Sequence, residues 1–303
     1  MAKFLIYTPS YNERSGGIIV LHKLCHLLND LGHEAYVYPY AYTYEINRFN
    51  LLENIFNFIK WSFFSSITPF KTNKHFNTPI FKGGIKDIEN FTVVYPEIVF
   101  GNPLRAKNVV RWLLHQPGFH EHRIYYGRNE LLFKFNSAIK DFSYPGSVTS
   151  SHELKVIHYP LEYYNNNTKI SRNGYAYCVR KGKGKTFVKD HSNDILIDNL
   201  THQKISEVFK RCEYFISYDT YTAYSIFAAL CGCISVVVGD SGVSKIDWYP
   251  NVQDRYGIAY GMEDIPWACQ TMSKVYDRVL SEETKSRDNV AMFVEECNRY
   301  FQS

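Results

Sequence analysis

Residues 214–240 read YFISYDTYTAYSIFAALCGCISVVVGD, and this stretch decides the fold class. Its pattern is a strand at residues 214–217, a polar loop at 218–222, an apolar helix at 223–230 and a buried strand at 234–238. Strand, helix and strand in this order indicate a parallel sheet covered by helices. We therefore predict an α/β protein whose polar loop lies at the carboxyl end of a strand, where such sheets bind ligands.

The polar loop and a second loop upstream both favour an anionic ligand. The polar loop opens a helix, whose free N–H groups and positive end attract negative charge. Residues 180–185 read RKGKGK and follow a probable strand at 175–179. Glycine lets the backbone approach a ligand closely, and Arg and Lys neutralise phosphate oxygens. Together the two loops predict a ligand that carries a diphosphate. The candidate ligand-binding residues are Arg180, Lys181, Lys185, Asp219, Thr220, Tyr221 and Thr222.

The composition allows two domains and argues against a dedicated DNA-binding domain. The chain has 303 residues, enough for two domains of roughly 150 residues each. Its net charge of +4 is too mild for a dedicated DNA-binding domain, although it suits an anionic ligand. Aromatic residues make up 17% of the chain. They fit either an AT-rich genome or faces on which sugars and bases stack.

The cysteines and the apolar segments indicate the cellular compartment in which we expect the protein. The seven cysteines are odd in number and form no CxxC pair, so we expect reduced thiols in a cytoplasmic protein. We identify no signal peptide before Phe4, and no apolar run reaches the ~20 residues of a membrane span. Residues 51–67 predict an apolar helix. It is either buried or rests on the inner membrane face with Lys60 and Trp61 at the interface.

The N-terminal half repeats the alternation of strands and helices. A strand at residues 3–8, a loop containing Glu13, a helix that opens with Gly16-Gly17 and a strand at 34–38 form one parallel unit. Strands are predicted at 91–95 and 108–114, the second followed by His115, and extended segments at 131–135 and 153–158. Residues 165–173 read as a linker. We expect domains at 1–165 and 166–303, with final helices at 266–280 and 282–301, the last one packing back on the first domain.

This layout resembles the GT-B glycosyltransferases, in which two Rossmann-like domains face each other across a cleft. Three pieces carry the resemblance. Gly16-Gly17 looks like the glycine loop of the family, and Arg180, Lys181 and Lys185 look like its donor-phosphate cations. Residues 227–237, FAALCGCISVV, are similar to a helix-to-strand block of nucleotide-sugar transferases, glutamate-alanine-x-x-cysteine-glycine-x-proline-valine-valine. The family places a ribose-binding glutamate where this chain has Phe227, with Asp219, Thr220, Thr222 and Ser225 as the nearest polar substitutes.

The resemblance implies a metal-independent enzyme that needs no cofactor. The donor, a UDP-sugar or another nucleotide sugar, is a substrate bound by the C-terminal domain. Arg180, Lys181 and Lys185 then hold its diphosphate, Gly16 and Gly17 meet it from the other domain, and Asp219, Thr220, Tyr221 and Thr222 position ribose or phosphate. His115 is expected to contact the sugar. Glu13 and Glu121 are the candidate general bases.

Several alternatives stay open. The acceptor is a bacterial surface glycan or a lipid-linked molecule, or else a hydroxymethylated base in phage DNA. A nucleotide-sugar epimerase and a non-catalytic nucleotide-binding module fit the same loops. Residues 180–185 could form a solvated surface loop, and Asp219 could merely cap the following helix. His120, Glu121 and His122 suggest a metal site, but their spacing suits a strand and no third ligand is evident, so we predict none.

Overall fold

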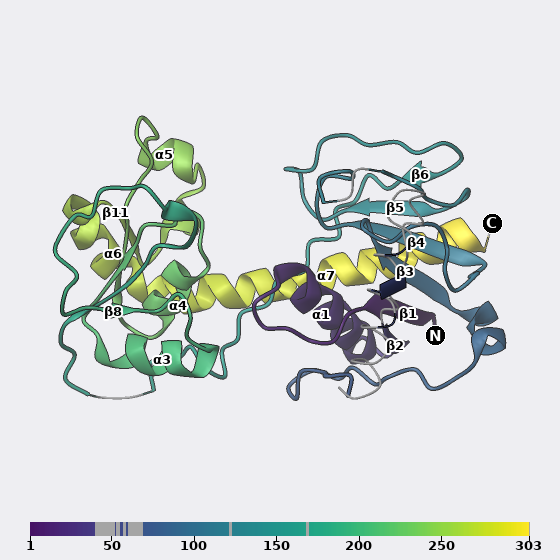
Figure 1. Cartoon of the computed structure of the whole chain (residues 1–303), viewed down its shortest axis with the longest axis horizontal. Helices are drawn as coiled ribbons and strands as arrows, with labels where there is room; N and C mark the ends of the chain where they lie inside the picture. The colour runs from purple at the N-terminus through teal and green to yellow at the C-terminus, as the bar shows by residue number, and fades with distance from the viewer. Residues whose placement is uncertain are drawn as a thin grey trace. The chain divides into compact units, whose positions relative to one another are not determined.

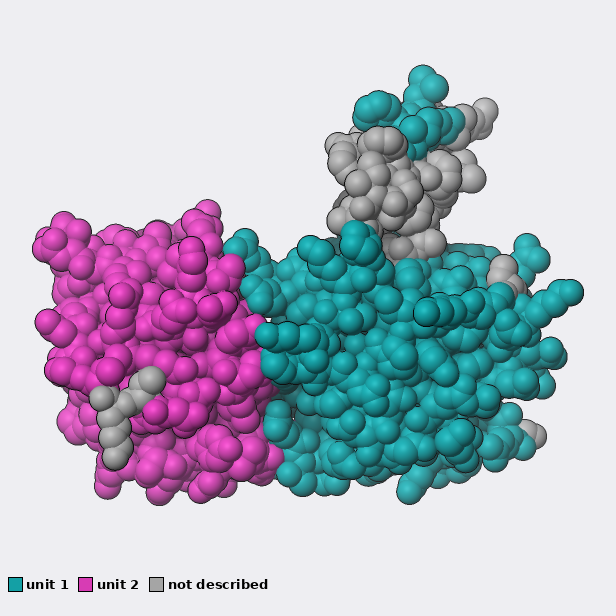
Figure 2. All heavy atoms as spheres, turned by 90° about the horizontal axis from the view of Figure 1, so that it is seen from below, with its two compact units in different colours: residues 1–158, 283–303 teal, residues 159–282 magenta. Residues whose placement is uncertain are grey.

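A computed structural model describes residues 1–39, 52, 55, 56, 59, 69–120, 123–167 and 170–302. The chain divides into two compact units (Figure 2). Unit 1 comprises Met1–His158 and Glu283–Ser303, and unit 2 comprises Tyr159–Glu282. The sequence analysis placed the change of domain at residue 166. In the structure it comes earlier, and Leu154 and Val156 just before it are buried in the core of unit 1.

Unit 1 contains a six-stranded parallel sheet in the order β2-β1-β3-β4-β5-β6 (Figure 1). Because β2 lies on one side of β1 and β3 on the other, the chain reverses direction across the sheet between β1 and β3. In open α/β sheets, the carboxyl edge at such a reversal forms the ligand-binding crevice. The elements are β1 (Lys3–Thr8), α1 (Gly16–Asp30), β2 (Glu34–Pro39), the 3-10 helix η1 (Ile85–Asn90), β3 (Thr92–Pro96), β4 (Asn108–Leu113), β5 (Leu131–Lys134) and β6 (Val148–Thr149).

Most of the predicted elements of unit 1 are confirmed, with one error. The extended segment at 153–158 forms no strand. Its apolar side chains Leu154 and Val156 nevertheless enter the core. Short β6, which the sequence did not predict, forms the edge of the sheet instead. The predicted helix at 51–67, with Lys60 and Trp61, lies largely outside the described residues, as do Glu121 and His122.

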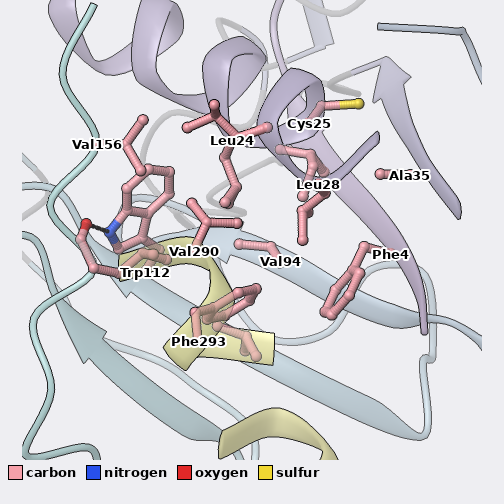
Figure 3. Close-up of a cluster of buried hydrophobic side chains, with 14 of the residues drawn as sticks. Phe4, Leu24, Cys25, Leu28, Ala35, Val94, Trp112, Val156, Val290 and Phe293 are labelled. Atoms are coloured by element: carbon pink, nitrogen blue, oxygen red, sulfur yellow. Dashed lines mark hydrogen bonds between the residues drawn. The ribbon is translucent and has the colours of Figure 1, made fainter. Parts of the chain in front are cut away.

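Helices α1 and α7 (Val275–Phe301) supply the apolar side chains that cover one face of this sheet (Figure 3). Leu24 and Leu28 come from α1, and Phe293 comes from α7 and packs against Phe4 of β1 at 5.4 Å between ring centroids. Trp112 of β4 is fully buried, and its indole N–H donates to the carbonyl oxygen of Leu154 at 3.0 Å. Buried Trp is tolerated where its N–H finds such a partner.

A buried ion pair anchors the segment of chain that follows β3. Arg111 and Glu130 are 0% and 1% exposed and form two hydrogen bonds of 2.9 Å. The guanidinium also donates to the carbonyl oxygens of Val99 and Gly101 at 2.7 and 2.8 Å. All these contacts satisfy a charge that would be costly to bury alone. They make the segment after β3 a rigid part of the unit.

Unit 2 contains a five-stranded parallel sheet in the order β11-β10-β9-β7-β8. Here the chain reverses between β7 and β9. The strand, polar loop, helix and strand predicted from residues 214–240 are confirmed. The elements are β7 (Tyr175–Cys178), η2 (Arg180–Gly182), β8 (Ile195–Leu196), α3 (His202–Arg211), β9 (Tyr214–Ser217), α4 (Tyr224–Leu230), β10 (Ile234–Val237), α5 (Lys245–Trp248), η3 (Val252–Arg255), β11 (Ile258–Tyr260), η4 (Met262–Asp264), α6 (Ile265–Thr271) and η5 (Met272–Lys274).

The C-terminal helices differ from the prediction in where they break. We predicted a break at residue 281, but α7 runs without interruption from Val275 to Phe301 (Figure 1). Its residues belong to unit 2 up to Glu282 and to unit 1 from Glu283. Residues 280–282 contain neither glycine nor proline, so nothing there ends a helix. The break lies after α6, at Thr271, whose hydroxyl accepts from the N–H of Gly257 at 3.0 Å.

The two parallel sheets with their helices confirm the α/β class and two Rossmann-like halves. The facing arrangement with a cleft stays a prediction. Among the described residues, no helix combines the length and the apolar character needed to cross a bilayer.

Candidate functional site

The predicted loops of unit 2 meet at the carboxyl edge of its sheet, at the reversal between β7 and β9. Arg180 follows β7, and Asp219 and Thr220 follow β9. The Nε of Arg180 lies 3.6 Å from Oδ2 of Asp219. Lys185 donates a hydrogen bond of 2.7 Å to the hydroxyl of Thr220. The structure therefore brings together residues that lie about 35 positions apart in the sequence.

Arg180 is held in an unusual backbone conformation. Its φ of +42° lies in the left-handed region, which non-glycine residues rarely adopt. The carboxylate of Asp198 stabilises this turn by accepting from the N–H groups of Val179 and Arg180, at 3.2 and 3.0 Å. The guanidinium lies over the ring of Tyr224 at 5.0 Å. Strain of this kind is concentrated at functional sites. The sequence analysis did not identify Asp198, which lies two residues after the end of β8.

The structure gives Gly182 a role that differs from the predicted close approach of the backbone to a ligand. A Cβ atom at this position would lie 2.0 Å from the carbonyl oxygen of Tyr218, so only glycine fits. The glycine thus lets the loop after β7 contact the backbone after β9, rather than a ligand. Gly184 has a φ of +97° and no atom near the position of a Cβ. Gly184 allows the left-handed backbone conformation of the turn, and the space next to this residue is open.

Lys185 is fully engaged within the protein. Besides Thr220 it contacts the carbonyl oxygen of Val238 and Oδ1 of Asp240, each at 2.7 Å. An ammonium group has three N–H donors, and all three have partners here. The bonds from Lys185 and then Thr220 lower the pKa of Asp240. Lys185 therefore joins the ends of β7, β9 and β10, whereas the side chain of Arg180 is 38% exposed. Lys181 is exposed.

Asp219 and Thr222 each accept a hydrogen bond from a backbone N–H two residues ahead, while the cap residue of α4, Ala223, makes no side-chain hydrogen bond to the helix. Oδ1 of Asp219, which is 5% exposed, accepts from the N–H of Tyr221 at 3.3 Å. The hydroxyl of Thr222 accepts from the N–H of Tyr224 at 3.4 Å. Both side chains thus stabilise the turn into α4. Tyr221 is 60% exposed and packs edge-on against Tyr249.

Phe227 belongs to an aromatic cluster in the interior. It is 5% exposed and stacks on Tyr164 at 4.3 Å with an interplanar angle of 13°. Tyr164 in turn shares a 2.6 Å hydrogen bond with Nδ1 of His202. The chain therefore fills with apolar rings the position where the GT-B family carries its ribose-binding acid. On the same helix, the buried hydroxyl of Ser225 has no hydrogen-bond partner among the described residues.

A buried network that the sequence analysis missed fixes the rest of the loop after β7. Nε2 of His191 and the hydroxyl of Tyr218 lie 2.7 Å apart, and Nδ1 of His191 lies 2.7 Å from the carboxylate of Asp194. The Tyr218 hydroxyl also accepts from the N–H of Val188 at 3.0 Å. Because Tyr218 directly follows β9, the network ties residues 188–194 to the same sheet edge. Polar residues spaced along a loop carry no distinctive signal of such a network.

In unit 1, Gly16 and Gly17 open α1 as predicted. Neither has a positive φ, and a Cβ at Gly16 would meet nothing within 4 Å, while one at Gly17 would lie 3.6 Å from Leu114. A Cβ atom therefore fits at both positions, with open space beside it only at Gly16. The cap residue Ser15 makes no side-chain hydrogen bond to the helix, and the first turn contains no acid. The start of α1 therefore lacks a side-chain cap from Ser15 and has open space beside Gly16.

Three side chains lie at the carboxyl edge of the unit 1 sheet. Glu13 is in the loop after β1, and His115 follows β4 and stacks on Phe119 at 4.0 Å. Nδ1 of His115 accepts from the N–H of Gln116 at 2.8 Å. Glu97, which the sequence analysis did not select, follows β3 directly, and burial raises its pKa. Its signal in the sequence was an acid two residues after the strand predicted at 91–95. The roles of Glu13 and His115 stay predictions.

Among the described residues, no group of three or more His, Cys, Asp or Glu side chains is arranged to hold a metal ion. Of the candidate ligands at 120–122, only His120 is described, and it packs against His115 and Phe119.

Comparisons with known proteins find only remote similarity. No family model matches the sequence, and no curated protein matches it. Among solved structures, the chain is similar to β-glucosyltransferase of phage T4, with 8% identity and a TM-score of 0.37. The match covers 99% of this chain and 97% of that chain. One of the two T4 structures contains the UDP-glucose substrate of that enzyme. MurG from Acinetobacter baumannii has 9% identity over 99% and 100% of the two chains, and a TM-score of 0.35. At these values the similarity does not identify the function of this chain.

Proposed function

We propose that the chain is a glycosyltransferase that moves a sugar from a nucleotide-sugar donor to a hydroxyl group of an acceptor. The observation that carries this proposal is the cluster of Arg180, Lys185, Asp219 and Thr220 at the sheet reversal of unit 2. That position is where open α/β sheets bind nucleotides. Cations, hydroxyls and a helix start are gathered there, and this combination suits a diphosphate.

The hydrogen bonds divide the cations of this cluster into two roles. Lys185 has no donor left, so it positions Thr220 and Asp240 rather than binding the ligand directly. The separation of 3.6 Å between Arg180 and Asp219 is long for a charge-assisted hydrogen bond. Arg180 can therefore turn to a phosphate with little loss, and exposed Lys181 can join it. Positive charge there stabilises the leaving nucleoside diphosphate as the bond to the sugar breaks.

Unit 1 supplies the acceptor side in this proposal. Gly16 leaves open space at the start of α1, where a phosphate or sugar can approach the backbone beside Gly17. His115 contacts the transferred sugar, and Glu13, in the loop after β1, belongs to the same unit. The acceptor is a bacterial surface glycan or a lipid-linked molecule, reached from the cytoplasmic side of the membrane. No metal takes part, because cationic side chains neutralise the diphosphate.

Donor binding is tested by thermal stabilisation with a panel of nucleotide sugars. We expect at least one to raise the melting temperature of the wild-type protein, since a ligand that binds only the folded state stabilises it. Arg180→Ala should weaken that donor by about tenfold, which corresponds to ~1.4 kcal/mol. The matched control is Lys204→Ala, which removes an exposed cation on α3 of the same unit. Equal donor affinity in Arg180→Ala and wild type would remove Arg180 from the site.

Transfer is tested with a donor labelled in its sugar. Label in a lipid or glycan fraction supports the proposed acceptor, and activity should survive added chelator. Label in hydroxymethylated DNA, with binding that weakens steeply as salt is added, would instead establish the DNA-modifying alternative. Conversion of the donor with no acceptor present would identify an epimerase. Donor binding without any turnover would leave a nucleotide-binding module.

A further inference from the structure

We propose that Glu97 is the catalytic base of unit 1, accepting the proton of the acceptor hydroxyl during transfer. This inference rests on the proposed function and adds a residue that neither the sequence nor the resemblance selected. Glu97 is the first residue after β3. Since the sheet of unit 1 reverses between β1 and β3, Glu97 lies at the crevice that the topology creates.

The side chain of Glu97 is held in place by neighbouring backbone. Its Oε2 accepts from the N–H of Leu114, at the end of β4, at 3.0 Å. Its own N–H donates to the carbonyl oxygen of Trp112 at 3.1 Å, and its carbonyl oxygen accepts from the hydroxyl of Tyr126 at 2.9 Å. Arg111 fixes the next turn of chain through Val99. A catalytic group needs this kind of support, because rates fall when it is misplaced by about 1 Å.

The electrostatic setting of Glu97 suits proton transfer. Burial raises its pKa above the ordinary 4.5, while the N–H groups of Glu97, Leu114 and His115 and the charge of His120 act in the opposite direction. The titratable side chains that interact with it are His120 and Tyr126. A base whose pKa lies closer to the working pH takes up a proton more effectively. Glu13, by contrast, lies in the loop after β1 rather than directly at the end of a strand.

An aromatic face adjoins Glu97 and suits the ring of an acceptor. His115, Phe119 and His120 pack together with ring centroids 4.0 to 5.0 Å apart. Phe119 is 67% exposed, so it presents its ring to solvent. The backbone N–H of His115 and the charge of His120 both lower the pKa of Glu97, so the residues of this face lie near its carboxyl. Sugar rings and bases pack well on such faces.

The step balances without any further reactant. The acceptor oxygen forms a bond to the anomeric carbon of the donor sugar while the bond from that carbon to the diphosphate oxygen breaks. The electron pair of the broken bond leaves with the nucleoside diphosphate. The proton of the acceptor hydroxyl passes to the carboxylate of Glu97, which later releases it to water.

The test compares wild type with Glu97→Gln, using the donor and acceptor found in the transfer assay. The amide oxygen of glutamine can still accept from the N–H of Leu114, so the fold is expected to persist. We expect kcat to fall by about 100-fold or more, the usual effect of losing a general base. The KM for the acceptor and the stabilisation by donor should stay within about threefold. Glu89→Gln, which changes an exposed carboxyl on η1, is the control for the loss of a negative charge.

The pH profile separates a base from a merely structural residue. In wild type, kcat should decline as the pH falls through the raised pKa of Glu97, and Glu97→Asp should keep this decline at a lower rate. In Glu97→Gln the decline should vanish. A direct titration of Glu97 followed by carbon NMR checks the raised pKa without any assay of activity. Near-normal kcat in Glu97→Gln, or a pKa at or below 4.5, would overturn the inference. A wild type that binds no nucleotide sugar would instead contradict the proposed function.

Discussion

The three hydrogen bonds of Lys185 explain how single side chains hold the candidate donor site together. Lys185→Met removes a group whose side chain is 18% exposed and which joins Thr220, Val238 and Asp240. We expect a loss of about 1.5 kcal/mol of folding free energy, the lower end for hydrogen bonds to a charged group, measured by urea unfolding. Because Lys185 and Thr220 lower the pKa of Asp240 in the folded state, this carboxylate stabilises the fold above its ordinary pKa of 3.8. The stabilisation is lost as the pH falls through the lowered value, and Asp240→Asn should abolish that part of the pH dependence. Unchanged unfolding of Lys185→Met would show that the bonds contribute nothing.

The contact between the loops after β7 and β9 depends on one glycine. A Cβ at Gly182 would lie 2.0 Å from the carbonyl oxygen of Tyr218, and backbone cannot move aside as a flexible side chain can. We expect Gly182→Ala to destabilise the protein by about 2 kcal/mol, as overpacking of an interior does, measured by urea unfolding. Gly16→Ala at the start of α1 is the comparison, because nothing lies within 4 Å of its Cβ. It should keep the stability within about 0.5 kcal/mol, since alanine is a better helix former. It should also weaken donor binding if a ligand approaches the backbone there. Equal stability of the two variants would contradict the close contact at Gly182.

The cysteines report on the packing of the whole chain. All seven are free, six are buried and Cys269 is exposed. Burial raises the pKa of Cys178 to about 11 and that of Cys231 to about 12, which suppresses the reactive thiolate. A thiol reagent at neutral pH should therefore modify one cysteine per native chain quickly, and Cys269→Ser should remove that reaction. All seven should react in denaturant. Fast labelling of a second cysteine in the native protein would show that one of the two cores is open.

Local patterns in the sequence predicted the class of most strands and of the longer helices, but neither α5 nor the 3-10 helices. The alternation of apolar runs and turn residues placed β1, α1, β9, α4 and β10 within a residue or two. Such patterns are local, since periodicity reports which face of a segment is buried. The sequence also placed Arg180, Asp219 and Thr220 in loops at the carboxyl ends of strands, where the structure has them. It missed β6, which has only two residues, and placed a break at residue 281 where α7 continues.

The order of the strands and the partners of the charges needed the folded chain. Strand order depends on pairing between distant segments, so the reversals between β1 and β3 and between β7 and β9 cannot be inferred from periodicity. Glu97 became a candidate only when it lay at such a reversal, hydrogen-bonded to the end of β4. Lys185 changed from a predicted phosphate ligand to a positioning residue because its three partners lie in the segments after two other strands, β9 and β10. Residue types set which interactions are possible here, and long-range packing selected which of them are made.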